Sequence, residues 1–411
     1  MKQNTPTRVV VINDTSTARG GATELALMSV RLLRARAVPV TYICGDSGLN
    51  DDLTTLGVTV IAANQKPLLE RATLDAMKSG IHNPGTCALI ARYVRDHDSP
   101  GTIYHVHGWS QILSPSIFAP LVPVAARTII HAHDMFLACP NGAYMDYPRN
   151  RICAHKPLGL ACLTTQCDKR SYAQKLWRVT RQLALHRSFD QKHPWAAIIT
   201  LHPQMQPFLT RAGYAPARIH TLRNPASPFS ATRIRAENAA GIAFVGRLER
   251  DKGVLNLAAA AARCAMPLTL IGDGPLRAQL SEQYPEATMA GWQDHDNIRH
   301  HLTNARALVM PTHHPEPFGL VTPEAVQSGL PVIVAETALI AQDVASNGFG
   351  RDVDVFDPTA MERALMWIRD MPDDAVKKIS IHCHAAGQQL STTPTGWGDD
   401  LLALYGQTLR A

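Results

Sequence analysis

The feature that most constrains the fold of this sequence is a run of apolar strand, glycine turn, helix and strand. The stretch TRVVVINDTS is a continuous apolar segment, and Gly20 and Gly21 follow it. Apolar residues then recur at helical spacing before a second apolar segment, VPVTYICG. Two strands joined through a helix must run parallel, so this pattern predicts a parallel sheet in an α/β fold.

The same pattern begins again in the second half of the chain. GIAFVGRL, PLTLIGDGP, ARALVMPTHHP and LPVIVAE have the character of buried strands, as do TIYHVHG, RTIIHAH and AAIITLH in the first half. A chain of 411 residues is too long for one ordinary core. We therefore predict domains at 1–225 and 226–395 and a terminal helix at 396–411, with the proline-broken stretch NPASPFSATRIRAEN as the linker.

The composition is that of a globular protein, with 45% hydrophobic and 18% charged residues. The N-terminal residues show no signal-peptide pattern, and no apolar run approaches the ~20 residues that span a bilayer. We expect a cytoplasmic protein, with the inner face of the plasma membrane as an alternative location. Nucleic acid is not among the expected partners.

The positive charge is concentrated in one segment. Ten Lys and Arg and two Asp lie between Arg149 and Lys192, which gives +8, so the rest of the chain carries about −2 of the net +6. Such a segment is either a solvated basic face or a docking surface for anionic lipid or an acidic substrate.

Four of the eight cysteines lie in a Cys-rich insertion at about 139–170, namely Cys139, Cys153, Cys162 and Cys167. Four thiolates can hold zinc tetrahedrally, and in a reducing compartment a metal site is favoured over a disulfide pair. The alternative is a set of unrelated packed thiols. A structural zinc is thus one of two interpretations of these cysteines.

A cationic turn follows the first strand of the second half. In VGRLERDKG, Gly246 permits a sharp turn, and Arg247 and Lys252 come just before a helix. Two cations beside a helix N-terminus suit a phosphate or a diphosphate. By themselves they are also ordinary solvated side chains.

Two carboxylates lie eight positions apart in HPEPFGLVTPEAVQSGLPVIV. Glu316 lies in a loop after a strand, and Glu324 lies in the first turn of a helix that we expect Thr322 to cap. An ionised carboxylate can accept from both hydroxyls of a vicinal diol. We expect the two carboxylates to point into the same site, with the backbone amides of Phe318 and Gly319 between them.

These elements together resemble a known family. FVGRLERDKG, LIGDGPLR, ARALVMPTHHPEPFGLVTPEAVQSGLPVIV and the N-terminal RGGATELA look like the GT-B glycosyltransferases of the large retaining family 4, the glycosyl transferases group 1. The resemblance covers nearly the whole chain. It implies two Rossmann-like parallel-sheet domains facing a central cleft, an N-terminal acceptor domain, a C-terminal nucleotide-sugar domain and a last helix that crosses back.

The resemblance also assigns roles in the second half. Glu324 corresponds to the residue that binds the nucleotide ribose, and Glu316 to the one that contacts the transferred sugar. Arg247 and Lys252 correspond to the pair that neutralises the diphosphate. The family usually shows EGFG, and Pro317 departs from that pattern.

In the first half, IYHVHGWS and IIHAHDMF carry histidines after strands. His131 and His133 flank one alanine, and we expect only one of them to face the site. The resemblance points to His133 as a contact of the transferred sugar and to His107 as a second candidate nearer the acceptor. Gly20 and Gly21 look like the family's diphosphate-approaching loop. His133 and Glu316 are the candidate catalytic residues, and no general base is assigned.

The segment SYAQKLWRVTRQLALHRSF is a candidate basic amphipathic helix. Leu176, Val179 and Leu183 form the predicted apolar stripe, with three arginines, Arg178, Arg181 and Arg187, largely off it. Such a helix suits either a membrane surface, where a lipid-linked acceptor would lie, or packing on its own domain.

The expected activity is the retaining transfer of a hexose from a UDP- or GDP-sugar to a saccharide or lipid-linked saccharide, in cell-surface polysaccharide synthesis and without a catalytic cofactor. The alternatives are a GT-B UDP-sugar epimerase and an inactive GT-B module that binds glycans. A Rossmann dehydrogenase is disfavoured, because no G-x-G-x-x-G follows the first strand.

Overall fold

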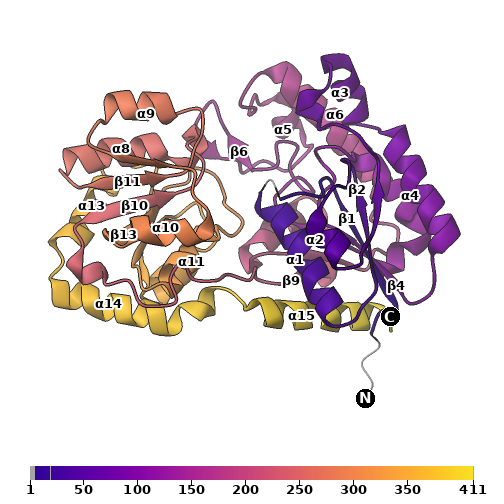
Figure 1. The fold of residues 1–411 in the computed structure, drawn as a ribbon. Helices are drawn as coiled ribbons and strands as arrows, with labels where there is room; N and C mark the ends of the chain where they lie inside the picture. The colour runs from indigo at the N-terminus through magenta and orange to yellow at the C-terminus, as the bar shows by residue number, and fades with distance from the viewer. Residues whose placement is uncertain (1–4, 19, 411) are drawn as a thin grey trace. The chain divides into compact units, whose positions relative to one another are not determined.

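The computed structural model describes residues 5–18 and 20–410 and consists of two compact units (Figure 1). The first unit contains residues 154–222 and 394–410 together with the described chain up to residue 143, and the second contains 144–153 and 223–393. The division falls after Leu222 and after Thr393. The segment 224–238, predicted as a linker, packs on the second unit, since Ile234 N–H donates to the carbonyl of Ser328 (2.8 Å).

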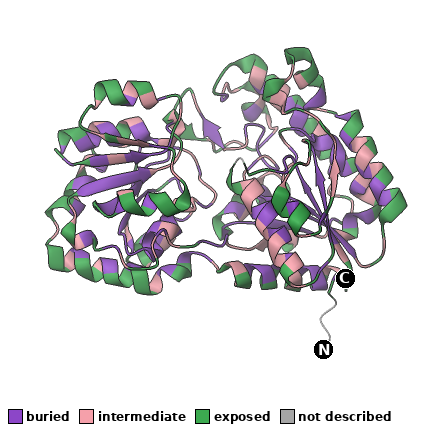
Figure 2. Cartoon of the chain, viewed as in Figure 1, coloured by how far each residue is buried: buried purple, intermediate pink, exposed green. Residues whose placement is uncertain are grey.

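The first unit contains a parallel sheet of order β3-β2-β1-β4-β5-β8-β9. Its strands are β1 (Arg8–Asn13), β2 (Val40–Cys44), β3 (Thr59–Ala62), β4 (Thr102–Val106), β5 (Thr128–Ala132), β8 (Ala197–Thr200) and β9 (Ile219–Thr221). The strands β2, β4, β5 and β8 are buried along their whole length, as parallel strands covered on both faces must be (Figure 2).

The second unit contains a parallel sheet of order β12-β11-β10-β13-β14-β15. Its strands are β10 (Gly241–Val245), β11 (Leu268–Ile271), β12 (Thr288–Gly291), β13 (Ala305–Met310), β14 (Val332–Ala335) and β15 (Gly350–Val353). A short antiparallel pair, β6 (Met145–Asp146) and β7 (Arg151–Ile152), belongs to the same unit.

Helices of the first unit cover both faces of its sheet. They are α1 (Gly21–Ala35), α2 (Asp51–Thr55), α3 (Thr73–Ser79), α4 (Pro84–His97), α5 (Leu160–Thr164), α6 (Tyr172–Ser188), α7 (Gln206–Arg211) and α15 (Pro394–Thr408), with 3₁₀ segments η1 (Leu68–Glu70), η2 (Pro115–Arg127), η3 (Pro203–Met205) and η4 (Pro216–Arg218). Helix α15 packs beside α1, where Arg36 pairs with Asp399 (2.6 Å). The C-terminal helix therefore completes the first unit.

Helices of the second unit surround its sheet in the same way. They are α8 (Val254–Arg263), α9 (Arg277–Gln283), α10 (His295–Leu302), α11 (Val321–Gln327), α12 (Ala341–Ser346), α13 (Ala360–Asp370) and α14 (Asp373–Ala386), with η5 (Ala236–Asn238), η6 (Arg250–Lys252) and η7 (Gly387–Leu390). A single apolar core runs through this unit from Phe229 to Leu390.

All nine strands that the sequence predicted are present, and the two parallel sheets confirm the predicted fold class. The carboxyl ends of parallel strands lie at one edge of each sheet, and this edge is where ligands of open α/β sheets bind. In the second unit the loops after β10 and β13 leave this edge. In the first unit the loops after β1, β4 and β5 do so.

Candidate functional site

Two glycines shape the turn that follows β10. Gly246 has φ 153° and Gly253 has φ 71°, both in the region that favours glycine. A Cβ at Gly253 would lie 1.9 Å from the carbonyl oxygen of Pro311, at the end of β13. The glycine therefore lets the turn after β10 pack directly against the backbone after β13, and it places Lys252 beside the loop that carries Glu316.

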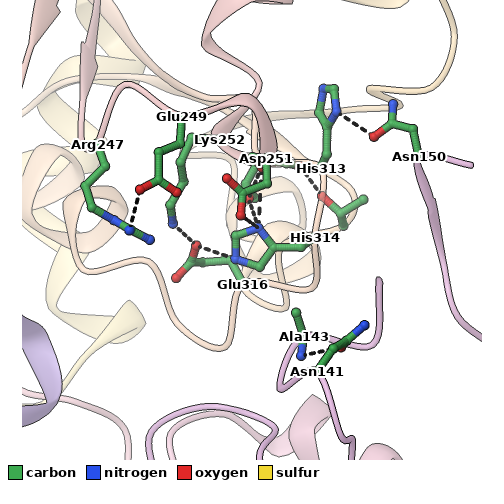
Figure 3. A network of polar contacts seen from close by, with 12 residues as sticks. Asn141, Ala143, Asn150, Arg247, Glu249, Asp251, Lys252, His313, His314 and Glu316 are labelled. Carbon is green, nitrogen blue, oxygen red and sulfur yellow. Dashed lines mark hydrogen bonds and ion pairs between the residues drawn. The ribbon is translucent and has the colours of Figure 1, made fainter. Parts of the chain in front are cut away.

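Lys252 in this turn forms an ion pair with Glu316, which lies in the loop after β13 (Figure 3). The Nε2 atom of His314 lies 3.2 Å from the same carboxylate. The side chains of Lys252 and Glu316 are only 21% and 19% exposed. Burial by itself would raise the pKa of Glu316, but Lys252 and His314 outweigh it and hold that pKa well below its usual range. The carboxylate is therefore ionised and acts as a hydrogen-bond acceptor.

Arg247 lies in the same turn but has a different environment. Its guanidinium pairs with Glu249 (2.6 Å), and its side chain is 67% exposed (Figure 3). An exposed pair of this kind is weak and exchanges readily with another anion. Arg247 is therefore free to turn toward a phosphate, whereas Lys252 is already fixed.

Glu324 has partners different from those of Glu316. It lies in the first turn of α11, and His295 Nε2 on α10 is 3.8 Å from its carboxylate. Burial raises the pKa of Glu324 to about 8. Around neutral pH this carboxyl is therefore largely protonated, so the two glutamates differ in charge as well as in neighbours.

The predicted capping role of Thr322 is wrong. Helix α11 begins at Val321, so Thr322 lies inside the helix, where it is buried and its hydroxyl contacts the sulfur of Met310 (3.5 Å). Phe318 is buried as well, and Gly319 takes φ 68° against Met310. Apolar packing of Phe318 and the close approach of Gly319 to Met310 thus hold the loop between β13 and α11 in place.

The first unit contains a polar cavity of about 70 Å³ at the carboxyl edge of its sheet. Its lining includes Asn13, Asp14, Thr23, His107, His131, His133 and Asp134. Helix α1 begins at Gly21, and Gly20 directly precedes it. A Cβ at Gly20 would meet nothing within 4 Å. The candidate residues of the first half thus lie around the start of α1 and the ends of β1, β4 and β5.

Asp14 organises one wall of this cavity and was not singled out from the sequence. Its carboxylate accepts hydrogen bonds from the backbone N–H groups of Gln111, Ile112 and Leu113 at 2.8–2.9 Å. Burial raises its pKa although these donors oppose the shift. The carboxyl at the end of β1 therefore fixes the loop after β4 that carries His107. Its sequence signal was a polar residue directly after a buried strand.

The expectation that only one of His131 and His133 faces the site is wrong. Their rings stack with centroids 4.3 Å apart, and His107 Nδ1 lies 3.0 Å from His133 Nε2. Residues i and i+2 of an extended chain point to the same face, so the intervening alanine does not separate them. His105 joins them on that face, with its ring centroid 4.0 Å from that of His107.

These four histidines form a cluster of neutral rings. Burial lowers the pKa of His105 and of His133 to about 3, and it lowers the pKa of His107 and of His131 well below 6.5. Burial also raises the pKa of Asp134 to about 6. The four rings are therefore uncharged, whereas Asp134 is still largely ionised near neutral pH.

The four cysteines are divided between the two units. Cys139, Cys162 and Cys167 belong to the first unit, and Cys153 lies in the segment 144–153 that belongs to the second. The ammonium of Lys175, 1% exposed, donates to Cys167 Sγ (2.9 Å) and lies 3.6 Å from Cys162 Sγ. Burial opposes the charge of Lys175, but the neighbouring cysteines outweigh it and raise its pKa.

The predicted stripe on α6 is only partly correct. Leu176 and Leu183 are exposed, whereas Val179 is buried. Arg181 is buried as well, with its guanidinium 4.9 Å from the ring centroid of Phe136 and its NH1 3.1 Å from the carbonyl of Ser110. Periodicity placed Arg181 off the apolar stripe, but aromatic rings and a backbone carbonyl stabilise its charge in a buried position.

Comparison with known proteins supports this architecture. Residues 231–380 match the family model described as glycosyl transferases group 1. Glycogen synthase of Mycobacterium tuberculosis is 27% identical over 285 residues, which is 64% of this chain and 64% of that protein. The chain thus matches somewhat less than two thirds of the length of this relative.

Solved structures resemble the chain along almost its whole length. Sucrose-phosphate synthase from Thermosynechococcus elongatus superposes with a TM-score of 0.70 at 18% identity, over 97% of this chain and 98% of that one. Alr3699/HepE of Anabaena, solved in complex with UDP and glucose, gives 0.65 at 15% identity, over 96% and 97%. At such identities the likeness concerns the fold.

Two parallel-sheet domains in series, matched by glycosyltransferases along the chain, define a protein of the GT-B class. The match over residues 231–380 places its second domain in the glycosyl transferases group 1 family. In the described part of the chain, no helix has both the length and the apolar character to cross a membrane.

Proposed function

We propose that the chain is a retaining glycosyltransferase that moves a hexose from a nucleotide diphosphate sugar to a saccharide or a lipid-linked saccharide. The observation that carries the proposal is the contact of Glu316 with Lys252 and His314, held by glycine turns at the carboxyl edge of the second sheet. It lies inside the part of the chain that matches group 1 glycosyltransferases.

The donor binds through charge at one end and through hydroxyl groups at the other. Lys252 and the exposed Arg247 supply positive charge for the diphosphate, with the N-terminus of α8 directly behind them. Glu316 accepts hydrogen bonds from hydroxyls of the transferred sugar, because its carboxylate stays ionised. Both UDP- and GDP-sugars satisfy this arrangement, and the neighbour solved with UDP and glucose makes UDP-glucose the first donor to test.

Glu324 serves the ribose of the nucleotide. A carboxyl that is largely protonated without ligand can both donate to and accept from a vicinal diol. Phe318 and Gly319, in the loop between the two glutamates, present backbone N–H groups to the diphosphate.

In the first domain, His133 contacts the transferred sugar, His107 lies toward the acceptor, and Gly20 and Gly21 approach the diphosphate. Neutral rings suit hydroxyl recognition, because each neutral imidazole offers one donor and one acceptor. Retention of configuration follows when the departing phosphate takes the acceptor proton on the same face of the sugar, so the step needs no protein base.

The acceptor belongs to cell-surface polysaccharide synthesis and is presented at the inner face of the membrane. Large exposed apolar side chains gather on the first domain in η1, α3 and α6, where Leu69, Leu74, Leu176 and Leu183 are solvent-facing. Trp177 on α6 donates to the carbonyl of Met77 on α3 (2.9 Å), so these elements are neighbours. With the exposed basic side chains of the same unit, Lys169, Arg170, Arg187 and Lys192, they offer an apolar and cationic surface for anionic lipid. Flotation with anionic but not with neutral vesicles is the expected result.

The Cys-rich insertion holds a structural zinc in this proposal. Lys175 and Asn141 are placed to donate hydrogen bonds to thiolate ligands, since Lys175 Nζ is 2.9 Å and Asn141 Nδ2 is 3.6 Å from Cys167 Sγ. Cys139, Cys153, Cys162 and Cys167 are the predicted ligands. The sulfur shell of such a zinc, about 2.3 Å from the metal, is measurable by X-ray absorption.

The test is nucleotide release by the purified chain with UDP- and GDP-sugars and a panel of saccharide acceptors. Glu316→Gln and Glu324→Ala should lower the rate at least about 100-fold, because each removes a contact with the donor. Glu282→Ala on the exposed face of α9 is the matched control and should leave it unchanged. Product configuration by NMR tests retention.

Other outcomes point to the alternatives. An inactive glycan-binding module would release no nucleotide with any donor while still being stabilised by a glycan. An epimerase would convert a UDP-sugar to its UDP-linked epimer without an acceptor and without net release of UDP.

A further inference from the structure

The base of the first-domain cavity contains three histidines whose ligand atoms come together. His105, His107 and His131 are 0–4% exposed, and one ring nitrogen of each lies within 4.8 Å of the others. Within residues 5–18 and 20–410, these three side chains have ligand atoms close enough together to share one metal ion. Three imidazoles at this spacing can close around a divalent transition metal, whose nitrogen ligands lie about 2.0–2.1 Å from the ion.

The hydrogen bonds of the trio leave inward-facing nitrogens unused. His105 Nδ1 bonds to the Tyr405 hydroxyl (2.7 Å), and His107 Nδ1 bonds to His133 (3.0 Å). The Nε2 atoms of both rings, and both nitrogens of His131, are buried without a partner. Buried unpaired nitrogens cost about 1–3 kcal/mol each, so such a group of them needs a ligand.

The pattern of bonded and unbonded nitrogens is that of metal-binding histidines. A ligating histidine usually uses its second nitrogen for a hydrogen bond that fixes the ring, and Tyr405 and His133 provide that bond here.

We propose that His105, His107 and His131 bind a divalent transition metal ion such as Zn²⁺ at the base of the first-domain cavity. This site is separate from the cysteine site, and it does not depend on the proposed transfer reaction. His133 contacts two of these side chains but is not one of the proposed ligands.

The ion would also determine the protonation of His133. With metal on His107 Nε2, the proton of His107 must lie on Nδ1, which then donates to His133 Nε2. His133 must in turn carry its own proton on Nδ1, which has no partner in the described residues. His133 thereby becomes a fixed hydrogen-bond donor for a hydroxyl oxygen in the cavity.

The experiment measures bound zinc and its ligands in the full chain. After loading with one to two equivalents of ZnCl₂ and gel filtration, metal content and zinc K-edge absorption are recorded. We expect a shell of nitrogen atoms at about 2.0–2.1 Å, distinct from the sulfur shell at about 2.3 Å that the cysteines would give.

His131→Leu is the decisive variant, because neither nitrogen of His131 has a partner whose loss would disturb the fold. It should lose the nitrogen shell and about one equivalent of zinc, while its melting temperature in EDTA matches or exceeds that of the wild type. His220→Leu on β9 is the control and should keep the nitrogen shell and the bound zinc. A wild-type protein without a nitrogen shell, or a His131→Leu variant that retains one, would overturn the proposal; a sulfur shell alone supports only the cysteine site.

Discussion

The two domains share a fold but handle charge in opposite ways. In the second domain, Lys252 keeps Glu316 ionised, and tight glycine turns hold the pair in place. In the first domain, burial keeps His107 and His133 neutral, and the loop glycine Gly20 has open space around it. The comparison indicates that one α/β architecture can present either a charged pair or neutral hydrogen-bonding rings at the carboxyl edge of its sheet.

The largest expected effect is the loss of stability on adding a side chain at Gly253, compared with the same change at Gly348. Gly253→Ala should destabilise the protein by roughly 2–5 kcal/mol, because its Cβ would lie 1.9 Å from the Pro311 carbonyl and its φ is positive. Gly348→Ala has the same φ of 71° but open space, and should cost only about 1 kcal/mol. Urea unfolding measures both.

Gly20→Ala extends this comparison to the first domain. It should change the free energy of unfolding by less than about 0.5 kcal/mol, because nothing lies within 4 Å of the added Cβ. Equal losses for Gly20→Ala and Gly253→Ala would show that the two turns do not differ as described.

The next effect concerns the ion pair. Lys252→Met should destabilise the protein by about 2 kcal/mol and abolish most donor binding, because Glu316 would remain buried without its main partner. In the first domain, His133→Leu removes a neutral group and should cost about 1 kcal/mol or less. Thermal unfolding and calorimetric titration with UDP measure these changes.

A double variant isolates the pair itself. Lys252→Met combined with Glu316→Gln removes both charges and should recover part of the lost stability. If the double variant were as unstable as the sum of the two single variants, the pair would not be coupled.

The smallest effect is a difference in pH dependence. The folded-state pKa of Glu324 is about 8, above its ordinary value of 4.5, so the folded protein holds a proton that the unfolded chain loses between these pH values. The free energy of unfolding should therefore fall as pH rises from about 4.5 to 8. Glu324→Gln should remove this fall, so it should be more stable than the wild type at pH 8.5.

Asp134 provides the matching measurement in the first domain. Its pKa is raised from 3.8 to about 6, so Asp134→Asn should remove a fall that lies at lower pH, between about 4 and 6. Denaturant unfolding at a series of pH values distinguishes the two variants. Coincident profiles would contradict the separate environments assigned to these carboxyls.

The central strands were predictable from the sequence, and the edge strands were not. Every predicted strand lies inside its sheet, whereas the missed strands β3, β9, β12 and β15 are the four outer ones. Central parallel strands are covered on both faces and appear as continuous apolar runs such as VVVI. Edge strands such as IHT are only partly buried, so hydrophobicity alone does not distinguish them from loops.

The candidate site was predictable where a residue's role depends on local spacing. Lys252 and Glu316 meet because both follow adjacent strands, β10 and β13, which the motif order already indicated. Arg181 and Lys175 were not predictable as buried cations. The partners of Arg181 are a ring and a carbonyl from segments distant in the sequence, and those of Lys175 are thiols from the loop before the helix. Helical periodicity contains no information about these contacts.

The return of α15 to the first unit has a consequence for biosynthesis. Tyr405 reaches His105 from the last helix, so the domain that leaves the ribosome first lacks part of its interior until residues 394–410 have also emerged. The second unit, whose main segment ends at Thr393, can finish folding earlier. The nascent chain is thus expected to complete its second unit before its first, the reverse of their order in the sequence.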